Sequence, residues 1–151
     1  MSATIREQII AAYVTRLESW TTANGYNHNC GAKVQRAVQH VEFKDLPVCV
    51  LFPQSEAVEQ RYNQNLCEMT IKIEAIATLG TGNASEIQEE LLGDIIRIMT
   101  DQTVSVTALI EDIVYTNGGG AELINPEEQT VGAVAEFKIK YFTIIGDPYS
   151  Q

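Results

Sequence analysis

The sequence has no long apolar run, few cysteines and no leading basic segment, and each shortage excludes a class of protein. No stretch approaches the roughly 18 consecutive apolar residues of a membrane-spanning helix, so we expect no membrane insertion. The first residues lack a basic segment followed by an apolar one, so the pattern indicates no secretory signal. Cys30, Cys49 and Cys67 are odd in number and widely spaced, which favours reduced thiols over a disulfide framework.

Positive charge is also scarce. The chain has 10 Lys and Arg against 20 Asp and Glu, a formal net charge of −10. A surface that wraps nucleic acid needs clustered Lys and Arg for the phosphates, so this balance argues against DNA binding. It is compatible with a soluble surface that repels DNA.

Motifs for catalysis and metal binding are missing. No Gly-x-Ser-x-Gly elbow occurs, and no Cys or His pair has the spacing of a zinc site, so His28 and His40 are expected in loops or on the surface. Gly80-Thr81-Gly82 stands between a predicted strand and a predicted helix, as a dinucleotide fingerprint does. Ser85 replaces the third glycine and the preceding strand has a polar face, so we interpret it as a turn. The sequence predicts no enzyme, no cofactor and no metal.

Length and periodicity predict one α+β domain over residues 1–151. A capping box at Thr4 and Glu7 opens an apolar-striped helix that runs to about Thr21. A second capping box, at Asn83 and Glu86, opens another. We expect both amphipathic helices to pack on one face of a largely antiparallel or mixed sheet of four to five strands.

Five stretches are predicted to form strands: residues 33–41, 48–52, 66–79, 110–116 and 131–145. The last is the longest, and its alternation predicts Phe137, Ile139 and Tyr141 facing the helices. At about 3.3 Å per residue it would span roughly 50 Å, so we expect it to bend near Gly132 or to project beyond its sheet. The face with Glu, Lys and Thr is predicted to be solvated or to meet another subunit.

Three polar connections stand between these strands. Residues 54–65 are interpreted as an irregular excursion between strands, and residues 117–120 (Asn-Gly-Gly-Gly) as a flexible tip. Residues 125–128 (Asn-Pro-Glu-Glu) are predicted to form a turn.

A resemblance adds to this description. Its residues run over nearly the whole chain: the opening helix from Ile5 to Ile10, the strand Val34–Val38, Asp45-Leu46-Pro47-Val48, the helix Glu89–Ile95, the strand Ile113–Thr116, and the finish from Val131 to Gly146-Asp147-Pro148-Tyr149. In their order and ending, these segments resemble the tail terminator family of tailed bacteriophages, also called tail completion or minor tail protein U-like proteins.

The resemblance implies a structural role in the virion. Members form a hexameric ring at the head-proximal end of the tail tube, end tube polymerisation and join the tail to the head–tail connector or neck. The implied partners are further copies of the chain, the tail tube protein and the connector, with assembly in the host bacterial cytoplasm. DNA would pass through the ring without specific binding. The family has no catalytic residues to carry over.

Closing a ring requires two different patches on each subunit. The candidate patches are the 54–65 excursion, the glycine-rich tip and the 147–151 tail. We hypothesise that Arg36 or Arg61, rare cations on an acidic chain, pairs with a carboxylate of a neighbouring subunit. The predicted interface residues are Arg36, Glu59, Arg61, Tyr62, Asn117, Gly118, Gly119, Asp147, Pro148 and Tyr149.

Two alternatives stay open on the sequence. One is another neck, head–tail joining or connector subunit of the same kind of particle. The other, of a different class, is a small-ligand-binding module or an unrecognised enzyme that uses the Gly80 turn.

Overall fold

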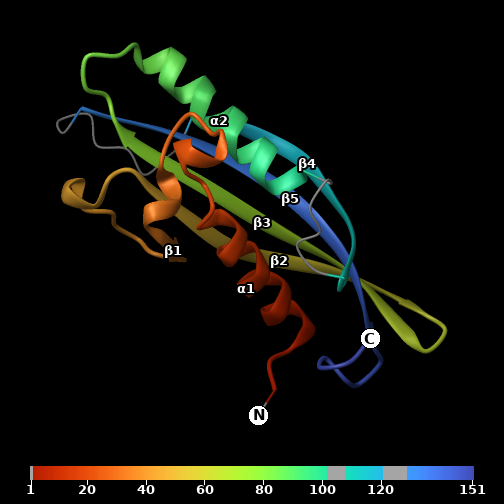
Figure 1. Ribbon diagram of the computed structural model, residues 1–151. Coiled ribbons are helices and arrows are strands. Elements are labelled where there is room, and N and C mark those ends of the chain that lie inside the picture. Colours follow the sequence, from red (N-terminus) through yellow and green to blue (C-terminus); the bar gives the residue numbers. More distant parts are fainter. Residues whose placement is uncertain (1, 102–107, 121–128) are drawn as a thin grey trace.

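Two α-helices cover one face of a five-stranded sheet (Figure 1). The computed structural model describes residues 2–101, 108–120 and 129–151. Its strands are β1 (Val34–Arg36), β2 (Val48–Arg61), β3 (Gln64–Thr78), β4 (Ile110–Gly120) and β5 (Thr130–Ile144), and its helices are α1 (Ile5–Leu17) and α2 (Ala84–Thr100). Short 3-10 turns lie at Thr22–Asn24, Cys30–Ala32 and Phe43–Asp45. This arrangement confirms the predicted α+β class.

The sheet is mixed, with strand order β1-β2-β3-β5-β4. Only β1 runs parallel to its neighbour; the other three pairings are antiparallel. The long strands β3 and β5 pair from Gln64↔Ile144 to Thr78↔Thr130 without a register shift. The pairing therefore continues through Gly132 without a register shift. β5 ends level with β3 at both ends, so it does not project beyond its neighbour in the sheet.

Both helices begin as their sequences predict. The Thr4 hydroxyl accepts a hydrogen bond from the Glu7 N–H at 3.1 Å, and the Asn83 side chain accepts from Ser85 and Glu86. The Glu7 carboxylate does not close the capping box, because it binds Arg36. Each cap satisfies N–H groups that the first helical turn would otherwise leave unpaired.

The main core lies between the helices and the sheet. It contains the apolar stripe of α1, the stripe of α2 and the inward side chains of β3 and β5. Phe137, Ile139 and Tyr141 are all buried there, which confirms the predicted face. Burial of one such large apolar side chain stabilises a fold by about 1.5–3 kcal/mol.

A smaller apolar cluster covers the opposite face beside β1. Val48, Val50 and Ile76 are buried against Val38, Val41 and Leu46 from the segment between β1 and β2. This cover explains why β2 begins as a continuously apolar run, since the first part of the strand is buried on both faces.

Two predicted loops are strands, so those predictions are wrong. The 54–65 excursion continues β2 to Arg61, turns at Tyr62 and Asn63, and returns as β3 (Figure 1). This hairpin reads as a loop because its residues are exposed on both faces, which leaves few apolar residues to mark the alternation. The glycines at 118–120, predicted as a flexible tip, belong to β4. Their backbone pairs with β5, and this pairing needs no side chains.

One predicted strand is shorter than expected. Of the 33–41 stretch, only Val34–Arg36 pairs with β2, and Ala37 adopts a φ of 51°. A left-handed residue ends the extended backbone there. The predicted turn at 125–128 lies outside the described residues.

Candidate assembly surfaces

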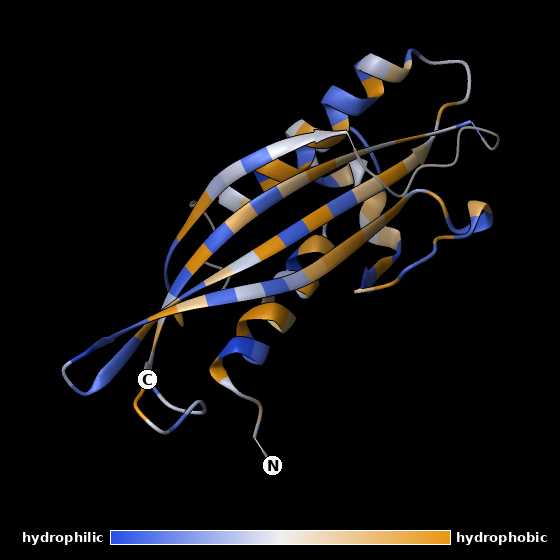
Figure 2. Ribbon diagram, turned by 180° about the vertical axis from the view of Figure 1, so that it is seen from behind, coloured by the Kyte–Doolittle hydropathy of each residue, from blue (hydrophilic) through white to orange (hydrophobic). Residues whose placement is uncertain are grey.

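The hairpin of β2 and β3 projects past the helices at one end of the molecule, which we call the hairpin end (Figures 1 and 2). Most of the exposed large apolar side chains of the described residues gather there. They are Val58, Tyr62, Ile144, Ile145 and Tyr149, leaving only Phe43 and Val114 elsewhere. Tyr62, at the turn, is fully exposed. Val58 faces the helix side of the sheet and Ile144 the polar side, so these side chains share one end of the molecule and not one face. Exposed apolar side chains gathered at one end suit contact with another protein.

The base of the hairpin is tied to the body of the protein. Arg6 on α1 contacts the Glu56 carboxylate at 3.3 Å and donates to the Gln54 carbonyl at 2.5 Å. The Tyr141 hydroxyl donates a short hydrogen bond to the same carboxylate. Burial and this bond raise the pKa of Tyr141. The hairpin is thus held by α1 and β5 at its base, and only its outer half stands free of the helices.

The C-terminal residues fold back over the same end. The Pro148 carbonyl accepts from the Ile5 N–H at 2.9 Å, and the Ser150 carbonyl accepts from Ile144 at 3.0 Å. The Gln151 side chain donates to the Leu109 carbonyl at 2.7 Å. The Ile145 N–H donates to the carbonyl of Asn63, the residue after Tyr62, at 3.2 Å, so the candidates Asp147, Pro148 and Tyr149 follow closely on a residue bound to the hairpin turn. The Asp147 carboxylate accepts from the Tyr149 N–H.

The two candidate arginines already have partners within the chain. Arg36 forms a two-bond pair with Glu7, at 2.8 and 2.9 Å, which joins β1 to α1. The hydrogen bond from Arg36 lowers the pKa of Glu7. Arg61 holds Glu59 at 3.1 Å on the same strand. Pairing with a neighbouring subunit would have to share or replace these contacts, and it stays a prediction.

Nearly every cation of the protein is neutralised in the same way. Nine of the ten Lys and Arg lie within 4.0 Å of a carboxylate, and the tenth, Arg97, donates to the Gly25 carbonyl and stacks on Tyr26. On the sheet face away from the helices, Lys138 and Lys140 share Glu68. The excess negative charge is therefore left without cations to balance it.

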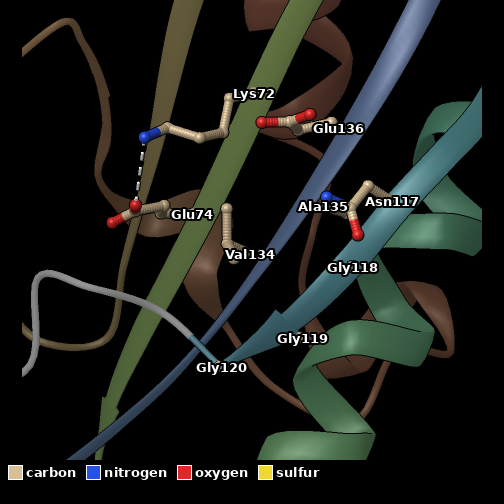
Figure 3. A pocket seen from close by; sticks show the side chains of 9 residues that line it. All are labelled: Lys72, Glu74, Asn117, Gly118, Gly119, Gly120, Val134, Ala135 and Glu136. Atoms are coloured by element: carbon tan, nitrogen blue, oxygen red, sulfur yellow. Dashed lines mark ion pairs between the residues drawn. The ribbon is translucent and has the colours of Figure 1, made fainter.

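The glycine row of β4 borders a shallow hollow of about 280 Å³ on this polar face (Figure 3). Lys72 and Glu74 form an ion pair at 3.5 Å beside it, and Asn117, Gly118 and Gly119 line it. On the opposite face of the sheet, which the helices cover, there is no room for a side chain at Gly118. A Cβ there would overlap the Tyr115 hydroxyl and press on Leu92. The three candidates thus lie together, far along the sheet from Tyr62.

A buried carboxylate that no sequence motif predicted organises one loop. Asp94 on α2 is 3% exposed and accepts from the Trp20 indole, the Asn27 backbone and side chain, and the His28 N–H, at 2.9–3.2 Å. Its position on the helix face shared with Leu91 and Ile95 was the available signal, because a charge on an apolar stripe indicates a satisfied polar partner.

Within the described ranges, no group of three or more His, Cys, Asp or Glu side chains could hold a metal ion. Cys30 and Cys49 are buried, and burial raises the pKa of both thiols, so neither is a ready nucleophile. None of the helices within those ranges is long and apolar enough to cross a membrane.

Comparison with known proteins relates the chain by shape alone. No family model matches the sequence, and no curated protein matches it. Among solved structures, a chain of the virion of a native gene transfer agent particle superposes with a TM-score of 0.59 at 11% identity. The match covers 87% of this chain and 92% of that chain. At this identity the likeness shows a shared fold.

Proposed function

We propose that this protein is a virion structural protein, and specifically a tail terminator that closes the head-proximal end of a phage tail tube as a hexameric ring. The observation that carries the proposal is the fold shared, over nearly the full length of both chains, with a protein of a gene transfer agent virion. The family resemblance in the sequence adds the position in the particle. The projecting hairpin end supplies an apolar surface suited to a protein partner.

In this proposal the hairpin end contacts another virion protein along the axis of the ring. Tyr62, Ile145 and Tyr149 would be buried there, since aromatic side chains dominate the energetics of protein interfaces. The polar sheet face would line a channel in which paired cations leave nothing free for passing DNA.

Electron microscopy of the purified protein and of virions tests the role. Six-fold rings at the junction of tail and head are the expected result. Twelve-fold rings would favour the alternative of a connector or neck subunit, and location of the protein away from the tail would contradict both.

The double variant Tyr62→Asn/Tyr149→Ser tests the hairpin end. Asn accepts the left-handed backbone of Tyr62, whose φ is 52°, so the turn is kept while both rings are removed. We expect normal folding with loss of tail attachment in an assembly reaction. Phe43→Asn, an exposed aromatic at a different site, is the matched control and should assemble normally. Equal assembly by the double variant would remove the hairpin end from the proposal.

The ligand-binding alternative is tested at the hollow beside Lys72 and Glu74 and at the Gly80 turn. Calorimetric titration with nucleotides is expected to give no heat of binding. A saturable signal abolished by Lys72→Ala would instead favour a binding module.

A further inference from the structure

The two outer edges of the sheet carry unpaired backbone near the hairpin end. β1 pairs with β2 only at Cys49, Val50 and Leu51, so in the described part of the chain no strand pairs with the outer edge of β2 beyond Leu51. β4 forms the opposite edge, and among the strands of residues 2–101, 108–120 and 129–151 it pairs only with β5. Open strand edges are templates for pairing with another chain.

Bulges divide each open edge into short regular segments. The register of β2 shifts between Pro53 and Glu56, and is regular from there to Arg61. The register of β4 shifts on both sides of the stretch 112–115. Because bulges disrupt pairing, the free edge of β2 near the hairpin end is regular from residue 56 to 61. The free edge of β4 is regular at 112–115, near the hairpin end, and again at 117–120, farther from it.

We propose that residues 58–61 of one copy pair antiparallel with residues 112–115 of the next, which extends the sheet from subunit to subunit around the ring. This inference rests on the proposed ring and names its contact. The direction fits, because successive antiparallel pairings of β2, β3, β5 and β4 leave the two edge strands running in opposite senses. Head-to-tail copies joined by such unlike edges form the heterologous contact that a ring requires.

The hydrogen-bonding groups alternate correctly for this pairing. The Cys49 N–H donates to the Lys33 carbonyl and Leu51 accepts from Ala37, which fixes which residues of β2 point toward its outer edge. Along a strand, the backbone N–H and C=O groups of successive residues point alternately to the two sides. Followed from β2 through β3 and β5 to β4, this alternation points the backbone groups of Val58, Gln60, Ile113 and Tyr115 toward the open edges. In the proposed register, Val58 meets Tyr115 and Gln60 meets Ile113, outward groups against outward groups.

The charged side chains favour the same register, with Gln60 opposite Ile113. Asp112 lies beside Lys140, and Lys140 beside Glu68, so charges alternate across the polar face and end on a carboxylate at the edge. Arg61, on the same face of β2, would meet Asp112 and continue the alternation. A shift by two residues would place Asp112 opposite Glu59, and facing like charges are destabilising.

On the helix side, the same register brings Val58 against Tyr115. Val58 is 56% exposed in the single chain, and an aromatic ring against a β-branched side chain is a favourable cross-strand pair. The Asp112 carboxylate now accepts from the N–H of Ile113 at 2.9 Å. Pairing would give that N–H to the Gln60 carbonyl of the next copy and free the carboxylate for Arg61.

Disulfide trapping tests the register in the full chain. In Arg61→Cys/Asp112→Cys the two Cα atoms would lie about 4.5 Å apart between copies, within disulfide range. Within one chain β3 and β5 separate these positions by three strand spacings, about 14 Å, so they cannot bond there. Arg61→Cys/Val114→Cys, shifted by two residues on the same face, is the matched control.

Under mild oxidation at rising protein concentration, we expect the first variant to give a ladder of linked chains ending at six, with the 61–112 peptide bond confirmed by mass spectrometry, and at least tenfold less product from the control. Absence of the 61–112 disulfide at every concentration, or equal linkage in the control, overturns the edge pairing. Six-fold rings in micrographs without that disulfide would leave the terminator role standing and remove only this contact. The disulfide with a ladder ending at another number would keep the contact and remove the hexamer.

Charge exchange gives a second test that does not depend on cysteine chemistry. Arg61→Asp or Asp112→Arg alone should weaken association at least tenfold by sedimentation, and the double exchange should restore it. Failure of the double variant to recover, with both singles folded, contradicts the Arg61–Asp112 pair.

Discussion

At the scale of single residues, Asp94 shows how a buried charge can hold a loop in place. Its carboxylate lies on a helix but accepts hydrogen bonds from Trp20, Asn27 and His28, all from the segment after α1. Hydrogen bonds to a charged acceptor contribute about 1.5–3 kcal/mol each, and donors left unpaired in the interior are costly. Asp94 therefore holds the segment between α1 and β1 from within, while Arg97 and Glu90 of the same helix contact Gly25 and His28 nearer the surface.

Replacement of Asp94 should destabilise the protein strongly. We expect Asp94→Ala to lower the free energy of unfolding by about 3–5 kcal/mol, because the Trp20 indole and two backbone N–H groups lose their buried acceptor. Urea unfolding followed by circular dichroism measures the loss. Glu89→Ala, exposed on the same helix, is the control and should change stability by no more than about 0.5 kcal/mol.

Tyr13 predicts how stability changes in alkali. Burial raises the pKa of its hydroxyl to about 12, above its ordinary value of 10.0. The unfolded chain releases this proton first, so its contribution to stability is complete below pH 10 and lost as pH rises through 12. Tyr13→Phe should lose stability less steeply over that window, by up to about 1.4 kcal/mol per pH unit. Equal slopes in urea titrations at pH 9–12 would contradict the assignment.

At the scale of elements, β4 depends on the absence of a side chain at one position. The Tyr115 hydroxyl lies over Gly118, next to Leu92 of α2, and Tyr115 packs edge-on against Phe137 at 5.7 Å. A methyl group at residue 118 would push this ring away from the sheet. Gly119 faces open space instead.

Gly118→Ala should therefore cost about 1–3 kcal/mol of stability through overpacking. Gly119→Ala, one residue along the same strand, has room for its methyl group and should be neutral or slightly stabilising. Thermal unfolding of the two variants side by side makes the comparison. Similar melting temperatures would show that Tyr115 moves aside without strain.

Apolar periodicity and helix caps in the sequence predicted the helices and strands that bury one face. They did not predict the strand segments whose side chains are exposed on both faces or absent. β3, β5 and both helices follow their apolar periods, since each packs against the core. The outer half of β2 has no such signal because water reaches both of its faces. The glycines of β4 have no side chains to alternate. Several candidate interface residues lie in these two segments. Contacts between distant strands, such as the hydrogen bond from Tyr141 to Glu56, leave no pattern in the neighbouring sequence from which they could be predicted.

At the scale of the whole molecule, two features disfavour DNA binding. The net charge is negative, and most of the few positive side chains are already paired with carboxylates. Cations are few, and nine of the ten are held by carboxylates of the same chain. Release of counterions from DNA needs free Lys and Arg, so the usual electrostatic driving force is missing.

We accordingly expect no measurable affinity for duplex DNA. Fluorescence anisotropy of a labelled 30-bp duplex at about 0.1 M salt should stay flat up to roughly 100 µM protein, the upper end of the range of non-specific dissociation constants, about 1–100 µM. Glu68→Gln, which releases Lys138 and Lys140, is the informative variant, since any binding it gains would come from those two cations. Salt-dependent binding by the unaltered protein would contradict a non-adhesive channel.

The hydrogen bond between Ile5 and Pro148 has a practical consequence for anyone who handles this protein. It holds the start of α1 against the C-terminal residues, and the C-terminus lies beside the hairpin (Figure 1), so a fusion at the C-terminus would crowd Tyr149. A circular permutant that links the old termini and opens the exposed turn at residues 80–83 would carry its tag at the opposite pole.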